Sequence, residues 1–93
     1  MRIIGYVEHP IMKITVFKMD DKRAVKFEAG LLEQTYKFRT FEGFSTLSEI
    51  QHWVDAELIQ AVENTFAQMN KQKSAALDRT LPVEIQEEFE EII

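Results

Sequence analysis

The sequence has no cysteine and no long apolar run, and these two absences exclude several classes of protein. Without cysteine there can be neither a disulfide framework nor a thiolate metal site. No stretch reaches the roughly 18 consecutive apolar residues that a membrane-spanning helix needs. A secretory signal is not expected either, because Glu8 interrupts the apolar run that starts at Ile3. We therefore expect a soluble, cytoplasmic protein with no membrane partner.

Motifs that carry chemistry are also missing. The 93 residues include only three glycines, and neither a glycine-rich phosphate-binding loop nor a nucleophile elbow occurs among them. His52 can meet Asp55 one helical turn later, but such pairs are ordinary on helix surfaces. The glutamates near the carboxyl terminus lack the spacing of a calcium-binding loop. The sequence therefore predicts no catalytic residue, no metal site and no cofactor, and favours a protein that is not an enzyme.

Alternation of apolar and polar residues is the clearest positive signal in the first half of the chain. Such alternation predicts antiparallel strands with one buried face and one face in water. Three strands are expected from this pattern, and a fourth is expected before them; the ranges are 11–19, 23–29, 32–40 and 3–8.

Turn residues between these strands predict how they pair. A two-residue loop at Asp21-Lys22 would place Val16 opposite Phe27 on the core face. A second loop at Gly30-Leu31 suits a hairpin turn that needs a positive φ at its first position. A tight turn at His9-Pro10 would join the first two strands, although proline fits poorly in the common hairpin turns. The sequence thus predicts an antiparallel meander of three to four strands.

The second half of the chain has helical periodicity. Residues 46–72 begin with a capping-box pattern and repeat apolar residues at steps of three and four, which predicts one long amphipathic helix. Residues 73–80 are expected to be a connector, and residues 81–93 a short terminal helix. The expected fold is a single α+β domain over residues 1–93, in which a sheet within residues 1–40 packs against the long helix.

Charge is divided unevenly along this chain. Residues 1–40 carry a net charge of +3 and residues 41–93 carry −8, within a total of −5. Such a split can mark an interaction surface, although it also arises when each half only solvates its own outer side. The strand alternation predicts a mixture of basic and aromatic side chains on the outer sheet face, namely Lys13, Phe17, Lys26, Lys37 and Arg39.

Three apolar residues of the second half join these five outer-face residues as a candidate interaction surface. Trp53 lies beside the apolar stripe of the long helix, so it either caps the edge of the core or stays exposed. Phe89 and Ile92 belong to the terminal stripe, which is too short to be stable alone and needs a docking surface. The acidic terminal segment could dock on the basic sheet of its own chain or of a neighbour.

Three functions are compatible with these patterns. The leading hypothesis is a non-enzymatic module for protein–protein interaction or self-association, for example as a homodimer. The alternative is a small-ligand binder with a cavity between sheet and helix, in which Gln34 is the polar group predicted inside. The third is binding of single-stranded nucleic acid on the outer sheet face, which is disfavoured because Glu28 and Glu33 share that face.

Overall fold

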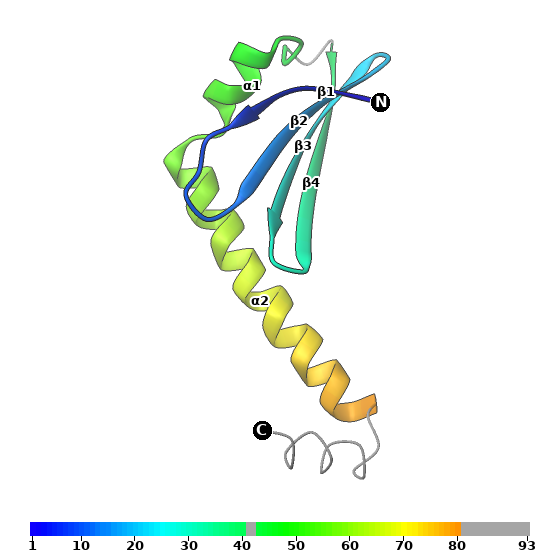
Figure 1. The fold of residues 1–93 in the computed structure, drawn as a ribbon, viewed down its shortest axis with the longest axis vertical. Helices are drawn as coiled ribbons and strands as arrows, with labels where there is room; N and C mark the ends of the chain where they lie inside the picture. The colour runs from blue at the N-terminus through cyan, green and yellow to red at the C-terminus, as the bar shows by residue number, and fades with distance from the viewer. Residues whose placement is uncertain (41–42, 81–93) are drawn as a thin grey trace.

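The computed structural model, which describes residues 1–40 and 43–80, contains one four-stranded antiparallel sheet followed by two helices (Figure 1). The elements are β1 (Arg2–Val7), β2 (Lys13–Met19), β3 (Lys22–Ala29), β4 (Leu32–Arg39), α1 (Leu47–Trp53) and α2 (Ala56–Thr80). The strands lie in the order β1-β2-β3-β4, so each pairs with its neighbour along the chain. The predicted α+β class and the antiparallel meander are confirmed.

The two later hairpins differ in how well their registers were predicted. The β3–β4 loop at Gly30-Leu31 is as expected, and Gly30 has a φ of +60°. The β2–β3 loop begins one residue earlier than predicted, at Asp20, so Val16 pairs with Val25 and the predicted pair with Phe27 is wrong. Asp20 adopts a φ of +40°, which aspartate tolerates better than most residues. The error moves the partner by two residues, so the same side chains still face the core.

The predicted tight turn at His9-Pro10 is wrong. β1 ends at Val7 and β2 starts at Lys13, which leaves five residues between the strands. A bulge at Ile4 also changes the register, so that Gly5 lies opposite Val16 and Ile3 lies opposite Phe17. As a consequence, Ile3 lies on the outer face of the sheet.

The predicted long helix over residues 46–72 is interrupted. Val54 leaves the helical region with φ −79° and ψ 81°, and α2 then starts afresh and continues to Thr80. The Asp55 carboxylate accepts a hydrogen bond from the backbone N–H of Leu58 at 2.8 Å, which caps the new helix. The predicted connector at 73–80 is therefore the end of α2. The predicted terminal helix at 81–93 lies outside the described residues.

The core lies between one face of the sheet and both helices. Its buried members come from β2 and β3, from the residues beside them and from the helices: Met12, Ile14, Val16, Val25, Phe27, Ile50, Val54, Val62 and Phe66. Gly5 lets α1 approach β1 closely, since a Cβ there would lie 2.5 Å from Cδ2 of Leu47. Both helices thus cover the same face of the sheet, and no helix within residues 1–40 and 43–80 lies on the opposite face (Figure 1).

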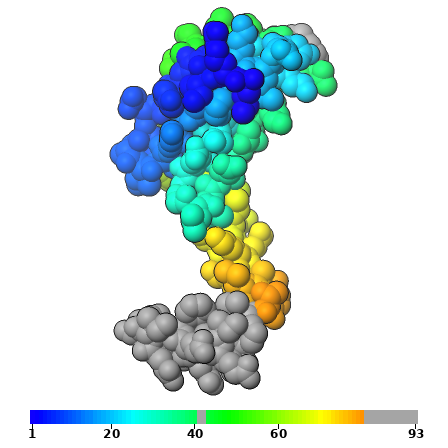
Figure 2. Space-filling model, turned by 45° about the vertical axis from the view of Figure 1, so that its right-hand side comes forward, coloured from blue at the N-terminus to red at the C-terminus, as the bar shows by residue number. Residues whose placement is uncertain are grey.

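The last part of α2 extends past the sheet. Val62 and Phe66 are the buried residues of this helix, and Met69 is the last side chain that packs against the core. Figure 2 shows the final turns, in orange, standing clear of the sheet. Leu77 on this extension keeps 45% of its surface exposed. Leu77 is thus an apolar residue that the sheet of its own chain does not cover. A helix segment without tertiary contacts is marginally stable in water.

Candidate interaction surface

The sheet face opposite the helices, called the outer face below, carries all five residues that the alternation predicted there. Lys13 and Phe17 come from β2, Lys26 from β3, and Lys37 and Arg39 from β4. The strand register brings them together, because Lys26 lies opposite Thr35, and Phe17 lies opposite Ala24, which in turn lies opposite Lys37. The outer face also receives Tyr6, which lies opposite Thr15.

A depression of about 410 Å³ lies on this face. It is lined from β2, β3, β4 and the amino terminus by Met1, Phe17, Met19, Ala24, Lys26, Glu33, Thr35 and Lys37. Thr15 and Ala24 each keep only 2% of their surface exposed although they point away from the helices. The neighbouring longer side chains therefore cover the middle of the face, and it has a small buried layer of its own.

Apolar side chains are exposed at the β1 side of the outer face. Ile3 and Tyr6 each keep 49% of their surface exposed, and Met1 keeps 87%. Ile3 reaches this position because the bulge shifts it opposite Phe17. Since sequence alternation gave no sign of the bulge, the sequence analysis missed Ile3 as a member of this surface.

The cations on the outer face differ in whether a nearby carboxylate pairs with them. The Lys26 ammonium lies 3.4 Å from a carboxylate oxygen of Glu28 and 3.9 Å from one of Glu33, and it also lies 5.5 Å from the centre of the Phe17 ring. Lys26 is thus largely neutralised. Within the part of the chain that the structure describes, no ion pair involves Lys37 or Arg39, and both are exposed. These two cations on β4 are available to a partner.

Trp53 lies on the other side of the sheet, among aromatic residues. Its ring centre is 4.6 Å from that of Phe38, 5.6 Å from that of Tyr36 and 6.3 Å from that of Phe44. The indole is half-buried and packs against the core. Of the two alternatives left open for Trp53, the structure shows the cap at the core edge, so Trp53 is not brought together with the outer-face residues. Phe89 and Ile92 lie outside the described residues.

Gln34 occupies the core face opposite Phe27 and is half-buried. Its side-chain amide donates a hydrogen bond to the backbone carbonyl of Val62 at 3.0 Å. This bond links β4 to α2 and satisfies the amide without a ligand. Gln34 lines neither the outer-face depression nor the two hollows described next.

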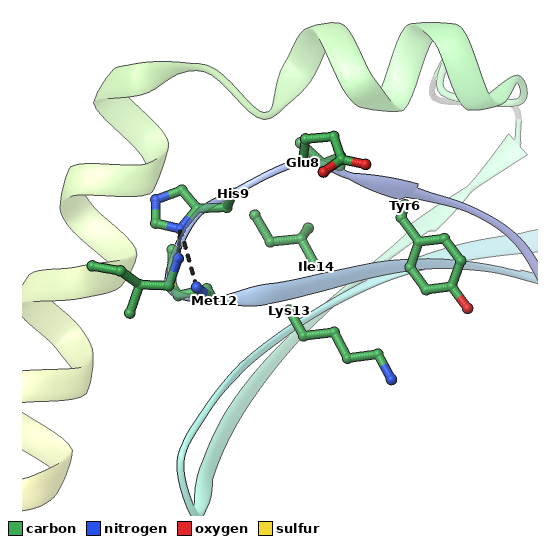
Figure 3. A pocket seen from close by; sticks show the side chains of 8 residues that line it. Tyr6, Glu8, His9, Met12, Lys13 and Ile14 are labelled. Atoms are coloured by element: carbon green, nitrogen blue, oxygen red, sulfur yellow. Dashed lines mark hydrogen bonds between the residues drawn. The ribbon is translucent and has the colours of Figure 1, made fainter.

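A second hollow of about 350 Å³ lies at the β1–β2 connection (Figure 3). His9 there turns toward α2, and its Nδ1 accepts hydrogen bonds from the backbone N–H groups of Ile11 and Met12 at 3.2 and 3.0 Å. Its Nε2 lies 3.6 Å from a carboxylate oxygen of Glu63. Nδ1 thus closes the five-residue connection on itself and Nε2 faces Glu63 of α2, which is a structural role that sequence reasoning missed.

A third, shallow hollow of about 680 Å³ borders α1 and includes His52, Ser48 and Glu49. Glu49 accepts hydrogen bonds from the backbone N–H and the hydroxyl of Thr46 in a capping box. Hydrogen bonds from the Thr46 side chain and backbone lower the pKa of Glu49 below its ordinary value of 4.5. A carboxylate that is ionised and engaged in a helix cap is not poised to exchange protons at neutral pH.

No group of three or more histidine, aspartate or glutamate side chains among the described residues could hold a metal ion. No helix in residues 1–40 and 43–80 is long and apolar enough to cross a membrane. Comparison with protein-family models, with curated proteins and with solved structures finds no match to the chain. The geometry of the surfaces described above is therefore the basis for assigning a function.

Proposed function

We propose that this protein is a non-enzymatic interaction module that binds an acidic, partly apolar polypeptide segment on its outer face. The observation that carries the proposal is a sheet face that neither described helix covers. Its edge strand β4 carries cations that form no ion pair among the described residues, and its other edge strand β1 carries exposed apolar side chains. Lys37 and Arg39 provide the cations, and Ile3 and Tyr6 provide the apolar surface. Protein interfaces combine these features, with aromatic and apolar contacts at the centre and polar groups at the rim.

The shape of the face favours a polypeptide over a small molecule. Small-molecule sites bury most of the surface of their ligand in a cleft or cavity. The outer-face depression is a dip in an open sheet, so a compact ligand would stay largely in water. An extended or helical segment can instead cover the depression and reach both Lys37 and the exposed Ile3.

The same face is poorly suited to single-stranded nucleic acid. Such binding needs aromatic rings that are free to stack on bases and cations that are free to contact phosphates. The Phe17 ring is already covered by the Lys26 ammonium, and Lys26 is paired with Glu28 and Glu33. The remaining cations are few, and the carboxylates would repel phosphate.

Position-specific photocrosslinking tests this function. A photoreactive residue replaces Thr35, which is exposed in the outer face, in the full chain produced in its own organism. We expect discrete adducts that resist nuclease and disappear with protease, and that are lost in the Lys37→Glu/Arg39→Glu variant. The matched control places the photoreactive residue at Gln68, which is exposed on α2. Adducts that nuclease removes, equal adducts at both positions, or no adducts at Thr35 would contradict the proposal.

A further inference from the structure

β4 is an edge strand whose free side no described element covers. The sheet order is β1-β2-β3-β4, so β4 pairs with β3 alone among the described strands. Each of its residues, Leu32–Arg39, lies opposite a residue of β3 without a bulge. In Figure 1, α2 passes the end of β4 near the β3–β4 turn, and no described helix or strand lies beside β4 on the side away from β3. A regular strand with an open edge is a template for pairing with another strand.

The hairpin geometry shows which main-chain groups of β4 point away from β3. In an antiparallel pair, alternate residues direct their N–H and C=O groups toward the partner strand. The N–H of Thr40, which follows β4 in the same register, donates a hydrogen bond to the carbonyl of Asp21 at 3.0 Å. The even-numbered residues of β4 are therefore the ones that are bonded to β3. The groups that point to the free edge belong to Glu33, Thr35, Lys37 and Arg39.

The opposite edge of the sheet is protected against such pairing. β1 has a bulge between Ile3 and Gly5. The side-chain amide of Gln51 in α1 also donates a hydrogen bond to the carbonyl of Tyr6 in β1 at 3.0 Å. A bulge and coverage by another element are two ways in which proteins prevent edge-to-edge association. Within the described residues β4 has neither protection, so it is the edge that is open to a partner.

The order of side chains along β4 makes this strand complementary to itself. When two copies of one strand pair antiparallel about a two-fold axis, residues at equal distances on either side of the axis lie opposite each other. Opposed residues also share a face of the sheet. With the axis at Thr35, Glu33 of each copy lies opposite Lys37 of the other. We infer that two copies of this chain pair through β4 with the axis at Thr35, which joins their four-stranded sheets into one.

Charge on the outer face disfavours two neighbouring positions of the axis. The groups that point to the free edge alternate along β4, so the axis must pass through a residue and not between two residues. An axis at Lys37 places this lysine opposite itself, and like charges that are directly opposed are destabilising. An axis at Gln34 places Glu33 opposite Thr35, and no opposite charges meet.

The core face distinguishes the axis at Thr35 from an axis at Tyr36, which also brings opposite charges together. An axis at Tyr36 sets the half-buried Phe38 against the polar Gln34, whose amide is already bonded to α2. The axis at Thr35 sets Phe38 against the half-buried Leu32 instead. The axis at Thr35 therefore matches charges on the outer face and apolar side chains on the core face.

Main-chain groups and side chains have different parts in this contact. The three opposed pairs centred on Thr35 would form about six main-chain hydrogen bonds, which no longer leave the edge unpaired. Exposed ion pairs contribute little to affinity, so the charges mainly select the register. Arg39 lies opposite Leu31 of the second copy and faces no carboxylate, so it stays available on the joined outer face. Because β1 is protected, the assembly closes at two copies. The inference does not rest on the function proposed above.

A charge-swap experiment on the full-length chain tests this pairing. We expect the natural chain to have a solution mass of twice 10.9 kDa by light scattering. Glu33→Lys and Lys37→Glu should each raise the dissociation constant of the dimer at least about tenfold, because the two-fold axis repeats the repulsion at both ends of the contact. An equimolar mixture of the two variants brings opposite charges together again at both ends, so its dissociation constant should return to within about threefold of the natural value.

The mixture separates contacts between copies from effects within one chain. Glu33 also lies 3.9 Å from Lys26 of its own chain, but a change in that contact persists in the mixture. The control is Lys71→Glu, which makes the same change in charge at an exposed position of α2 and should leave the dissociation constant unchanged. A monomeric natural chain, single variants as tight as the natural chain, or a mixture that stays weak would each overturn the inference.

Introduced cysteines test the register without a change in charge pairing at its centre. The chain has no cysteine of its own, so a single cysteine reports its distance from the same position in the second copy. Bonded pairs in an antiparallel ladder have Cα atoms about 5.5 Å apart, which a disulfide spans. Thr35→Cys should therefore form a linked dimer at least about tenfold faster than Glu33→Cys, which lies on the same strand and face. Equal rates, or faster linkage in Tyr36→Cys than in Thr35→Cys, would overturn the inference.

The dimer and the proposed function fail separately. A photocrosslinked adduct at Thr35 that contains only two copies of this chain supports the dimer and not the proposed function. An adduct with another protein, from a chain whose solution mass is 10.9 kDa, would overturn the dimer and leave the proposed function intact.

Discussion

Replacement of Gly5 by alanine probes the contact that holds α1 on the sheet. Gly5 lies opposite Val16, and the side chain of Leu47, the first residue of α1, passes directly over it. A Cβ at Gly5 would lie 2.5 Å from Cδ2 and 2.8 Å from Cδ1 of Leu47. Non-bonded carbons prefer about 3.5–4.0 Å, so the two groups must separate by about 1 Å.

Two opposing terms set the magnitude. Overpacking of this kind costs about 1–3 kcal/mol, and the lower half of that range applies because Leu47 is only half-buried and can move. Gly5 does not have a positive φ, so alanine fits its backbone and stabilises the protein by about 0.4–1 kcal/mol through the unfolded chain. We expect a net loss of about 1 kcal/mol in the natural chain. In a Leu47→Ala background the clash is absent, and the same substitution should stabilise by about 0.5 kcal/mol.

Urea denaturation of the natural chain, the two single variants and the double variant measures this reversal of sign. All four proteins must be compared at one concentration, because self-association would make the apparent stability concentration-dependent. A Gly5→Ala loss of equal size in both backgrounds would refute the reasoning, since it would place the cost in the strand and not in the contact with Leu47.

Three further predictions concern polar groups. Thr15→Val should raise the free energy of unfolding by about 1 kcal/mol, since the buried hydroxyl has no hydrogen-bond partner among the described residues; a loss in urea denaturation would contradict this. Gln34→Met should lower the free energy of unfolding by about 1 kcal/mol, because it removes the hydrogen bond to Val62. Gln34→Glu should lower it more at neutral pH than at acid pH, because an ionised carboxylate would face the Val62 carbonyl. Equal losses for Gln34→Glu at the two pH values would argue against this contact. The pKa of Glu49 is lowered in the folded state, so its stabilising contribution is present above the ordinary value of 4.5 and is lost as the pH falls below it. Thr46→Val should reduce this loss of stability, as measured by thermal melts between about pH 6 and about pH 3. An unchanged pH dependence would exclude the capping box as its cause.

The pairing of β3 with β4 shows how far local sequence determines a sheet. A glycine at the first position of a two-residue loop restricts the turn, and the turn restricts the register. At the β2–β3 turn, Asp20-Asp21 and Asp21-Lys22 are both acceptable loop sequences, so the sequence could not select between them. The choice changes each partner by two residues and leaves every side chain on its predicted face.

The long helix shows where periodicity fails as a guide. The apolar steps of three and four continue from Ile50 through Val54 to Leu58, so the pattern predicts one helix. The break depends on a local competition, in which the Asp55 side chain caps a new helix and Val54 turns into the core. Both halves keep their apolar residues against the sheet, and the period alone does not reveal the interruption.

The outer face shows most clearly which features the sequence determines and which depend on the tertiary structure. The sequence by itself determined that Lys13, Phe17, Lys26, Lys37 and Arg39 share one side of the sheet, because side chains alternate along a strand as a property of the backbone. Only the tertiary structure decided that both helices leave that side uncovered, that Glu28 and Glu33 neutralise the central lysine, and that the bulge adds an isoleucine at its edge. These features depend on contacts between residues far apart in the chain, which no local pattern specifies.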